Sequence, residues 1–213
     1  MKKTFLALAL FAAGSAHATQ SNINQISESH LDLGVANIQV DSTVRGISDV
    51  SLVGLQLGVG HQWTNGVYAT FDYTHAEDDV NFSLSDMSMD TEMELDVYQI
   101  MLGKQYALND VDYLFVEVGG YSRKATNTLP MNIGDMNERS EVSDENFVAK
   151  VGYKHDFSNG VLLGLSLEHE ESETMVGGEI QWSVADNFAI AAYAASNSDE
   201  ERYGLELRYF PYL

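Results

Sequence analysis

The sequence has no cysteine, only two prolines, and few basic residues, with 11 Lys and Arg against 32 Asp and Glu in 213 residues. Without cysteine, disulfide frameworks, thiolate-ligated zinc sites and thiol nucleophiles are all excluded. A formal net charge of −21 excludes a nucleic-acid-binding protein, because phosphate contacts require clustered Lys and Arg. Hydrophobic residues make up 45% of the chain, and this content is typical of a folded protein and not of a disordered one.

Long apolar runs are also scarce, and the clearest one, from Phe5 to Ala13, lies at the N-terminus. Two lysines precede this run, and a triplet with small outer residues ends at Ala18. The order predicts a secretory signal peptide over residues 1–18, with cleavage after Ala18. A transmembrane helix requires about 20 apolar residues, roughly twice the length of this run. We therefore expect an exported protein, located in the periplasm, the outer membrane or the medium.

The remainder of the chain alternates between apolar and polar residues. In residues 67–75, for example, Ala69, Phe71 and Tyr73 share one face and Thr70 and Asp72 share the other. This period of two is typical of half-buried β-strands. It predicts one domain, residues 19–213, with ten strands and eight as the alternative. The ten strands are expected over residues 30–40, 49–63, 67–76, 91–106, 111–123, 144–157, 161–170, 174–184, 188–197 and 201–213.

Short and long connections alternate between these strands. Tight turns are expected at residues 64–66, 108–110, 158–160 and 185–187, because Asn-Gly and Asn-Asp tolerate a positive φ. Longer loops are expected at 41–48, 77–90 and 124–143, with shorter connections near 171–173 and 198–200. The pattern predicts an all-β fold, an antiparallel up-and-down barrel with tight turns at one end and loops at the other.

The distribution of side chains favours a transmembrane barrel, whose apolar face points outward. Charges and glycines occur in mid-strand on the polar face, where a narrow barrel holds its interior side chains. Aromatic residues gather at strand ends, which predicts two girdles at the membrane interfaces. The first girdle comprises Trp63, Tyr106, Phe157, Trp182, Phe188 and Tyr209, and the second comprises Tyr73, Tyr98, Phe147 and Tyr203.

The last twelve residues resemble the C-terminal strand signature of bacterial outer-membrane proteins. Tyr203, Leu205, Leu207 and Tyr209 alternate with polar residues, although Pro211 takes an apolar position and the final residue is Leu instead of Phe. Over the mature chain, the architecture resembles small Gram-negative barrels of the OmpA, OmpX and opacity-protein kind. The resemblance implies residence in the outer membrane, with both termini in the periplasm and the loops outside. It also implies recognition of the last strand by the barrel-assembly machinery.

The interior of the barrel is the first candidate site. Six charged residues on the polar face are expected to form a lumen charge network: Glu117, Lys150, Lys154, Glu179, Glu206 and Arg208. Buried charges require partners, so one interpretation is an ion-paired plug. The alternative is a narrow porin that passes ions or small solutes.

The loop end carries the second candidate. Most acidic residues lie in four clusters, within residues 77–94, 135–145, 168–173 and 199–201. They predict a solvated, self-repelling surface. A sharper hypothesis is that Ca²⁺ or Mg²⁺ bridges these carboxylates to lipopolysaccharide phosphates, since hard cations prefer oxygen ligands.

Two histidines near acidic residues suggest a third candidate, a hydrolase at the rim. His75 precedes Glu77, and His169 stands between Glu168 and Glu170. A histidine paired with a carboxylate can act as a general base, but acid-rich loops place such neighbours together by chance. We therefore expect no catalytic, cofactor or metal site. The favoured function is a monomeric outer-membrane barrel with a structural or surface-interaction role.

Overall fold

The computed structural model describes residues 27–40, 50–63, 65–84, 87–130, 137–157, 159–170 and 173–211. The predicted signal peptide and its cleavage site at Ala18 lie outside the described residues. No helix in the described ranges is long and apolar enough to cross a membrane.

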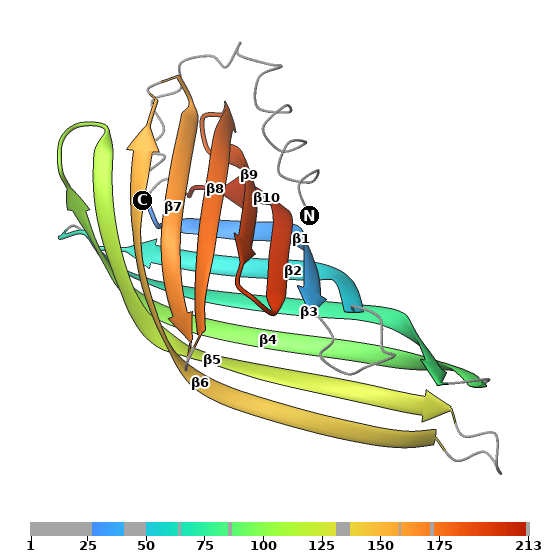
Figure 1. Cartoon of the computed structure of the whole chain (residues 1–213). Helices are drawn as coiled ribbons and strands as arrows, with labels where there is room; N and C mark the ends of the chain where they lie inside the picture. Colours follow the sequence, from blue (N-terminus) through green and yellow to red (C-terminus); the bar gives the residue numbers. More distant parts are fainter. Residues whose placement is uncertain are drawn as a thin grey trace.

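Ten strands form a closed antiparallel barrel, as predicted, and this excludes the eight-stranded alternative (Figure 1). Every strand pairs with its neighbours along the chain, and β1 pairs with β10 from Leu31–Tyr209 to Val40–Glu200, so the sheet has no open edge at this seam. The strands are β1 His30–Val40, β2 Val50–Gln62, β3 Val67–Leu84, β4 Met87–Ala107, β5 Asp112–Pro130, β6 Asn137–Asp156, β7 Val161–Glu170, β8 Glu173–Ala185, β9 Phe188–Ser196 and β10 Glu200–Tyr209.

The predicted long loops at 77–90 and 124–143 are wrong, because most of these residues continue the strands. β3 and β4 stay paired as far as Leu84 and Met87, and β5 and β6 as far as Pro130 and Asn137. Figure 1 shows these two hairpins projecting beyond the other strands. These segments have polar residues on both faces and therefore lack the alternation that predicts a strand, since outside a membrane neither face has to be apolar. We call this side of the barrel the hairpin end.

The opposite side, which we call the turn end, carries the predicted tight turns. Gly66 and Gly160 have φ angles of 76° and 89°, which only glycine adopts without strain. The backbone N–H of Trp63 donates to the carbonyl of Val67 at 2.8 Å, and the N–H of Phe157 donates to that of Val161 at 3.0 Å. These bonds close the first and third turns and set the register of the strands.

The exterior of the barrel is apolar and its interior is polar. Large aliphatic side chains stand outside, with Leu33, Leu55 and Ile100 exposed by 56%, 60% and 62%. Inside, Glu206 and Arg208 are exposed by only 5% and 9%. A continuous apolar band around the outside is the arrangement of a transmembrane barrel.

Inward-facing glycines provide room for inward-facing aromatic rings. Tyr68 pairs directly with Gly103 across β3 and β4, and a Cβ at Gly103 would lie 2.3 Å from the Tyr68 ring. Phe115 lies over Gly152 in the same way, with 2.2 Å between the ring and the position of a Cβ. The mid-strand glycines thus allow bulky rings to lie against the barrel wall and narrow the lumen.

Candidate functional site

Arg208 on β10 is the centre of one charge cluster in the lumen. Its guanidinium contacts Asp32 of β1 at 3.1 Å, Glu206 of its own strand at 2.9 Å and Glu179 of β8 at 3.1 Å. It also donates to the amide oxygen of Gln181 at 2.7 Å. The planar fork of arginine suits several acceptors at once, so one cation joins three carboxylates inside the barrel.

A second cluster lies on the side of β5, β6 and β7. The ammonium group of Lys150 is 3.9 Å from Glu117 and 3.4 Å from Glu168. The hydroxyl of Tyr68 on β3 donates to Glu117 at 2.8 Å, so an aromatic side chain also reaches this cluster. The interior charges in this part of the barrel are therefore paired and hydrogen bonded, as buried charges must be.

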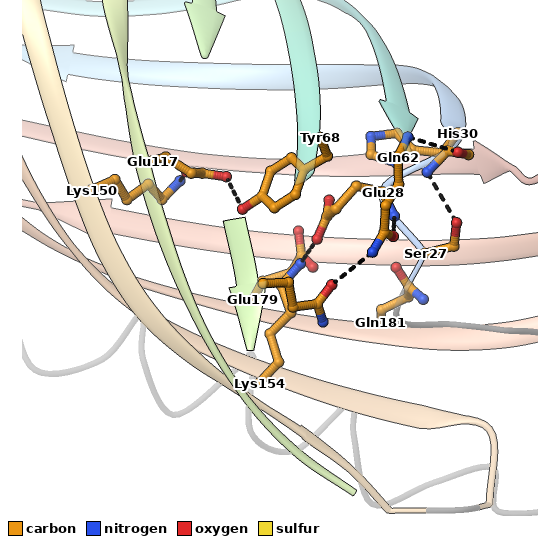
Figure 2. A network of polar contacts seen from close by, with 12 residues as sticks. Ser27, Glu28, His30, Gln62, Tyr68, Glu117, Lys150, Lys154, Glu179 and Gln181 are labelled. Carbon is orange, nitrogen blue, oxygen red and sulfur yellow. Dashed lines mark hydrogen bonds and ion pairs between the residues drawn. The ribbon is translucent and has the colours of Figure 1, made fainter. Parts of the chain in front are cut away.

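At the turn end, Glu28 precedes β1 and lies inside the barrel mouth. Its carboxylate pairs with Lys154 of β6, and its backbone N–H donates to the side chain of Gln62 at 2.9 Å. The neighbouring Ser29 hydroxyl accepts a hydrogen bond from the backbone of Gln62 at 2.9 Å. Figure 2 shows Glu28 meeting Lys154, with Tyr68 and Glu117 close by. The contact between Glu28 and Lys154 crosses the lumen, because β1 and β6 lie on opposite sides of the barrel.

At the hairpin end, a second ion pair crosses the lumen. Arg123 of β5 contacts Glu200, the first residue of β10, at 2.9 Å. Arg202 also pairs with Glu200, and lies 3.5 Å from Glu170 of β7. Burial raises the pKa of Glu200, but Arg202 and Arg123 outweigh this effect and hold the pKa below its ordinary value. Glu200 is therefore a carboxylate at neutral pH and holds two cations in place.

Apolar side chains narrow the lumen near the hairpin end. Ile38, Leu52, Ala76 and Leu95, one from each of β1 to β4, form a buried cluster. Val97 and Ala125 pack against it. This cluster lines one wall, and the arginines and glutamates line the other.

A cavity of about 270 Å³ remains in the lumen. Carboxylates in its lining outnumber cationic side chains, which makes it attractive to cations and repulsive to anions. The carboxylates are Glu28, Asp32, Asp72, Glu117, Glu168, Glu170, Glu179 and Glu206, and the Lys and Arg side chains are Lys150, Lys154, Arg202 and Arg208.

The six residues of the predicted lumen charge network all face inward but lie in three separate clusters. Glu179 and Glu206 contact Arg208, whereas Glu117 contacts Lys150. Lys154 pairs with none of the other five and contacts Glu28 instead. The predicted network is therefore distributed along the lumen.

Asp32 could have been found from the sequence, since His30 and Asp32 alternate with Leu31 and Leu33. Glu28 gave no such signal, because it precedes the alternating pattern. Arg123, Glu168, Glu170 and Arg202 lie at inward-facing positions of predicted strands, but their partners come from distant strands that the pattern does not specify.

All ten residues of the predicted girdles occupy outward-facing positions. Near the turn end, the rings of Phe188 and Tyr209 lie 5.0 Å apart, and near the hairpin end those of Tyr73 and Tyr98 stack at 4.8 Å. The remaining members have the same outward parity in their strands: Trp63, Tyr106, Phe157, Trp182, Phe147 and Tyr203. The apolar band lies between these two levels.

The histidines of the rim hypothesis lie on the outer surface. His75 contacts Asp96 at 2.9 Å, and its other ring nitrogen is 3.9 Å from Glu77. His169 contacts Thr174 at 3.1 Å and points away from Glu168 and Glu170, which face the lumen because successive strand residues alternate. The structure therefore separates His169 from its expected acidic partners. No group of three or more possible ligands within the described ranges could hold a metal ion.

A further histidine, His155, forms an outward-facing cluster at the turn end. Its ring nitrogen lies 2.7 Å from Asp112, which also accepts hydrogen bonds from Tyr153 and from Asn109 at 2.6 Å. The bonds from His155, then Tyr153 and Asn109, lower the pKa of Asp112 to about 2.

Comparison with solved structures places this geometry among known barrels. The translocator domain of the autotransporter NalP from Neisseria meningitidis matches with a TM-score of 0.54 and 10% identity, covering 96% of each chain. The chain has the fold of an outer-membrane β-barrel. At this identity the likeness shows the fold alone, and the resemblance predicted from the sequence is confirmed at that level.

Two other matches are to Ail, the attachment invasion locus protein of Yersinia pestis, and to the KdgM porin. Ail has a TM-score of 0.44 and 14% identity, covering 86% of this chain and 99% of Ail. KdgM has a TM-score of 0.45 and 11% identity, covering 85% of this chain and 99% of KdgM. No protein-family model matches the sequence, and no curated protein matches it.

Proposed function

We propose that this protein is an outer-membrane barrel with a closed lumen that acts at the cell surface through its acidic hairpin end. The observation that carries the proposal is the pair of cross-lumen contacts, Arg123–Glu200 at the hairpin end and Lys154–Glu28 at the turn end. A conducting pore would need an open path through the lumen past both of these contacts. Paired charges at both ends instead favour a rigid, non-conducting scaffold.

The proposed orientation has the turn end in the periplasm and the hairpin end outside the cell. Tight periplasmic turns and longer outer segments are typical of outer-membrane barrels. β1 begins and β10 ends at the turn end, which would place both termini in the periplasm. An epitope inserted between β5 and β6 should bind antibody on intact cells, and labelling only after permeabilisation would reverse the orientation.

Planar-bilayer recording of the purified barrel tests the closed lumen. We expect no steady conductance, with a conducting porin recorded in the same bilayers as the control. Steady single-channel steps would reject this proposal and favour a narrow porin.

The narrow porin remains the second candidate because of the 270 Å³ cavity and its excess of carboxylates. Such a pore would select cations over anions, since the eight carboxylates named above outnumber the four basic side chains. Reversal potentials in a salt gradient would then have the sign of a cation channel, and Lys150→Ala would change the conductance.

The proposed partners are lipids and the assembly machinery. The apolar band and aromatic girdles would contact outer-membrane lipid, and β10 would be the strand that the barrel-assembly machinery recognises. Divalent cations would bridge loop carboxylates to lipopolysaccharide. Millimolar Ca²⁺ should then raise the melting temperature in lipopolysaccharide-containing vesicles, and an unchanged melting temperature would remove this bridge from the proposal.

Rim hydrolysis is the distant third candidate. Of the two histidines in the rim hypothesis, His75 and His169, only His75 keeps carboxylate neighbours, and they lie with it on the outer surface. A hydrolase would lose activity in His75→Ala while keeping the heat-modifiable gel mobility of a folded barrel.

A further inference from the structure

Among the residues that the structure describes, the projecting part of β6 is paired on one side only. From Asn137 to Phe147 it pairs with β5, from Pro130–Asn137 to Gly120–Phe147. Its pairing with β7 begins one residue later, at Val148–Glu170. Among the described ranges, no strand pairs with the other side of Asn137–Phe147, which we call the β6 edge. Figure 1 shows β6 as the border strand of the projecting hairpins.

The β6 edge is accessible as well as unpaired. Residues 140–145 are all exposed, and Val142 and Phe147 are exposed by 62% and 66%. In an antiparallel sheet, every second residue of a border strand directs both its N–H and its C=O away from the sheet. These groups form hydrogen bonds readily with another extended chain, which is why exposed edges bind peptides.

The charge of the β6 edge indicates which chain it would accept. The segment has four acidic residues, Glu138, Glu141, Asp144 and Glu145, against the single basic Arg139. Lys124 of β5 pairs with Glu141 at 3.1 Å, and Asn146 donates to Asp144 at 2.8 Å. Glu145 forms no ion pair with another described residue and is exposed. A basic partner strand would therefore gain electrostatic attraction along the edge.

The same charges argue against self-association through this edge. Two copies paired edge to edge would bring like charges within one strand spacing of each other, which is destabilising. Acidic residues on an exposed edge thus discourage pairing with a second copy while leaving the backbone open to a chain of opposite charge.

We propose that the β6 edge binds an extended, basic peptide segment of another protein, which adds a strand to the projecting hairpins. The site rests on the proposed function, because the partner would have to reach the hairpin end from outside the cell. Backbone hydrogen bonds supply affinity, and the acidic side chains select for Lys and Arg. Val142 offers an apolar contact between them.

The test uses the full mature chain folded in detergent micelles and a fluorescent peptide of alternating lysine and valine. We expect the peptide to raise fluorescence anisotropy and to slow hydrogen–deuterium exchange in residues 137–147. A matched peptide with glutamate in place of lysine should not bind. A lysine peptide with N-methyl groups along one edge should bind at least about tenfold more weakly, because it cannot donate to a strand.

Charge variants locate the site. Glu138→Lys combined with Glu145→Lys should weaken binding about tenfold or more. Asp110→Lys combined with Asp186→Lys makes the same charge change at the exposed turn end and should leave binding unchanged. Equal weakening by both pairs would overturn the proposal, as would full binding of the N-methylated peptide. Protection confined to residues 78–84 of β3, which pair with β4 beyond the end of the β2–β3 pairing at Glu77, would also overturn it.

A dimer of the free protein with a protected β6 edge would also overturn the proposal that this edge binds a basic peptide.

The micelle experiment does not depend on the orientation of the barrel in the membrane or on its conductance. The two proposals can therefore fail separately. A non-conducting, correctly oriented barrel can fail to bind the peptide, and a conducting barrel can still bind it at the β6 edge.

Discussion

Arg123 and Glu200 form an ion pair of 2.9 Å between β5 and β10, which lie on opposite sides of the ten-stranded ring. Four strands separate them in either direction around the barrel. The contact therefore joins the two walls of the lumen directly.

Arg123→Ala should destabilise the barrel. Removing one partner of a buried ion pair costs about 3–5 kcal/mol, but Glu200 keeps Arg202, so we expect about 1–2 kcal/mol. Urea unfolding in lipid vesicles measures the loss. Glu200→Gln combined with Arg123→Ala should cost less than the sum of the single variants, and strict additivity would mean that the pair does not interact in the membrane-bound protein.

The two cross-lumen contacts should act as barriers in series. Glu28→Ala removes the contact at the turn end and Arg123→Ala removes the contact at the hairpin end. We expect each single variant to stay silent in planar bilayers and the double variant to conduct cations. Conductance from either single variant would show that only one barrier closes the lumen.

Arg208→Leu should have the largest effect on stability among the interior residues. It leaves Asp32, Glu179 and Glu206 without their shared cation, and we expect a loss of at least about 3–5 kcal/mol at pH 7. The loss should shrink as the pH falls, because protonation removes the unpaired charges. Heat-modifiable gel mobility after refolding measures the folded fraction.

The matched variant for this measurement is Arg208→Lys. It keeps the charge but lacks the planar fork, so it should restore folding only in part. Full folding of Arg208→Leu at neutral pH would contradict the assigned role of the arginine.

Gly103→Val should displace the ring of Tyr68 and break its hydrogen bond to Glu117. A Cβ at Gly103 would lie 2.3 Å from that ring, and overpacking of this kind costs about 1–3 kcal/mol. Gly178→Ala is the control, because the nearest atoms to its Cβ lie at 3.7 Å. Equal stability of the two variants in urea titrations would reject this account of the interior glycines.

Asp112 should titrate with a pKa of about 2, below its ordinary value of 3.8. Because folding lowers this pKa, the hydrogen-bonded carboxylate stabilises the folded protein at pH values above 3.8. This stability is lost as the pH falls toward the folded pKa of about 2. Carbon-13 NMR of the carboxyl group measures the value directly. In His155→Ala it should move back toward 3.8, and no movement would show that the hydrogen bond from His155 is absent.

The strands within the membrane were predictable, whereas those outside it were not. β1 and β7 match the predicted ranges 30–40 and 161–170 at both ends, because lipid on one side and a polar lumen on the other enforce alternation. The hairpin end has no such constraint. Its strands at 77–84 and 124–130 look like polar loops in the sequence, and only pairing between neighbouring strands reveals them.

The sequence by itself favoured ten strands over eight and determined the tight turns and which side chains face the lumen, since each depends on local alternation or on glycine and asparagine. Tertiary structure decided which charges meet. Glu28 reaches Lys154, and Arg123 reaches Glu200, only because closure of the barrel brings opposite strands within the length of two side chains. Closure also determined that β6 projects past β7, so that within the described ranges one edge of β6 has no partner strand, because relative strand length is a property of the assembled sheet.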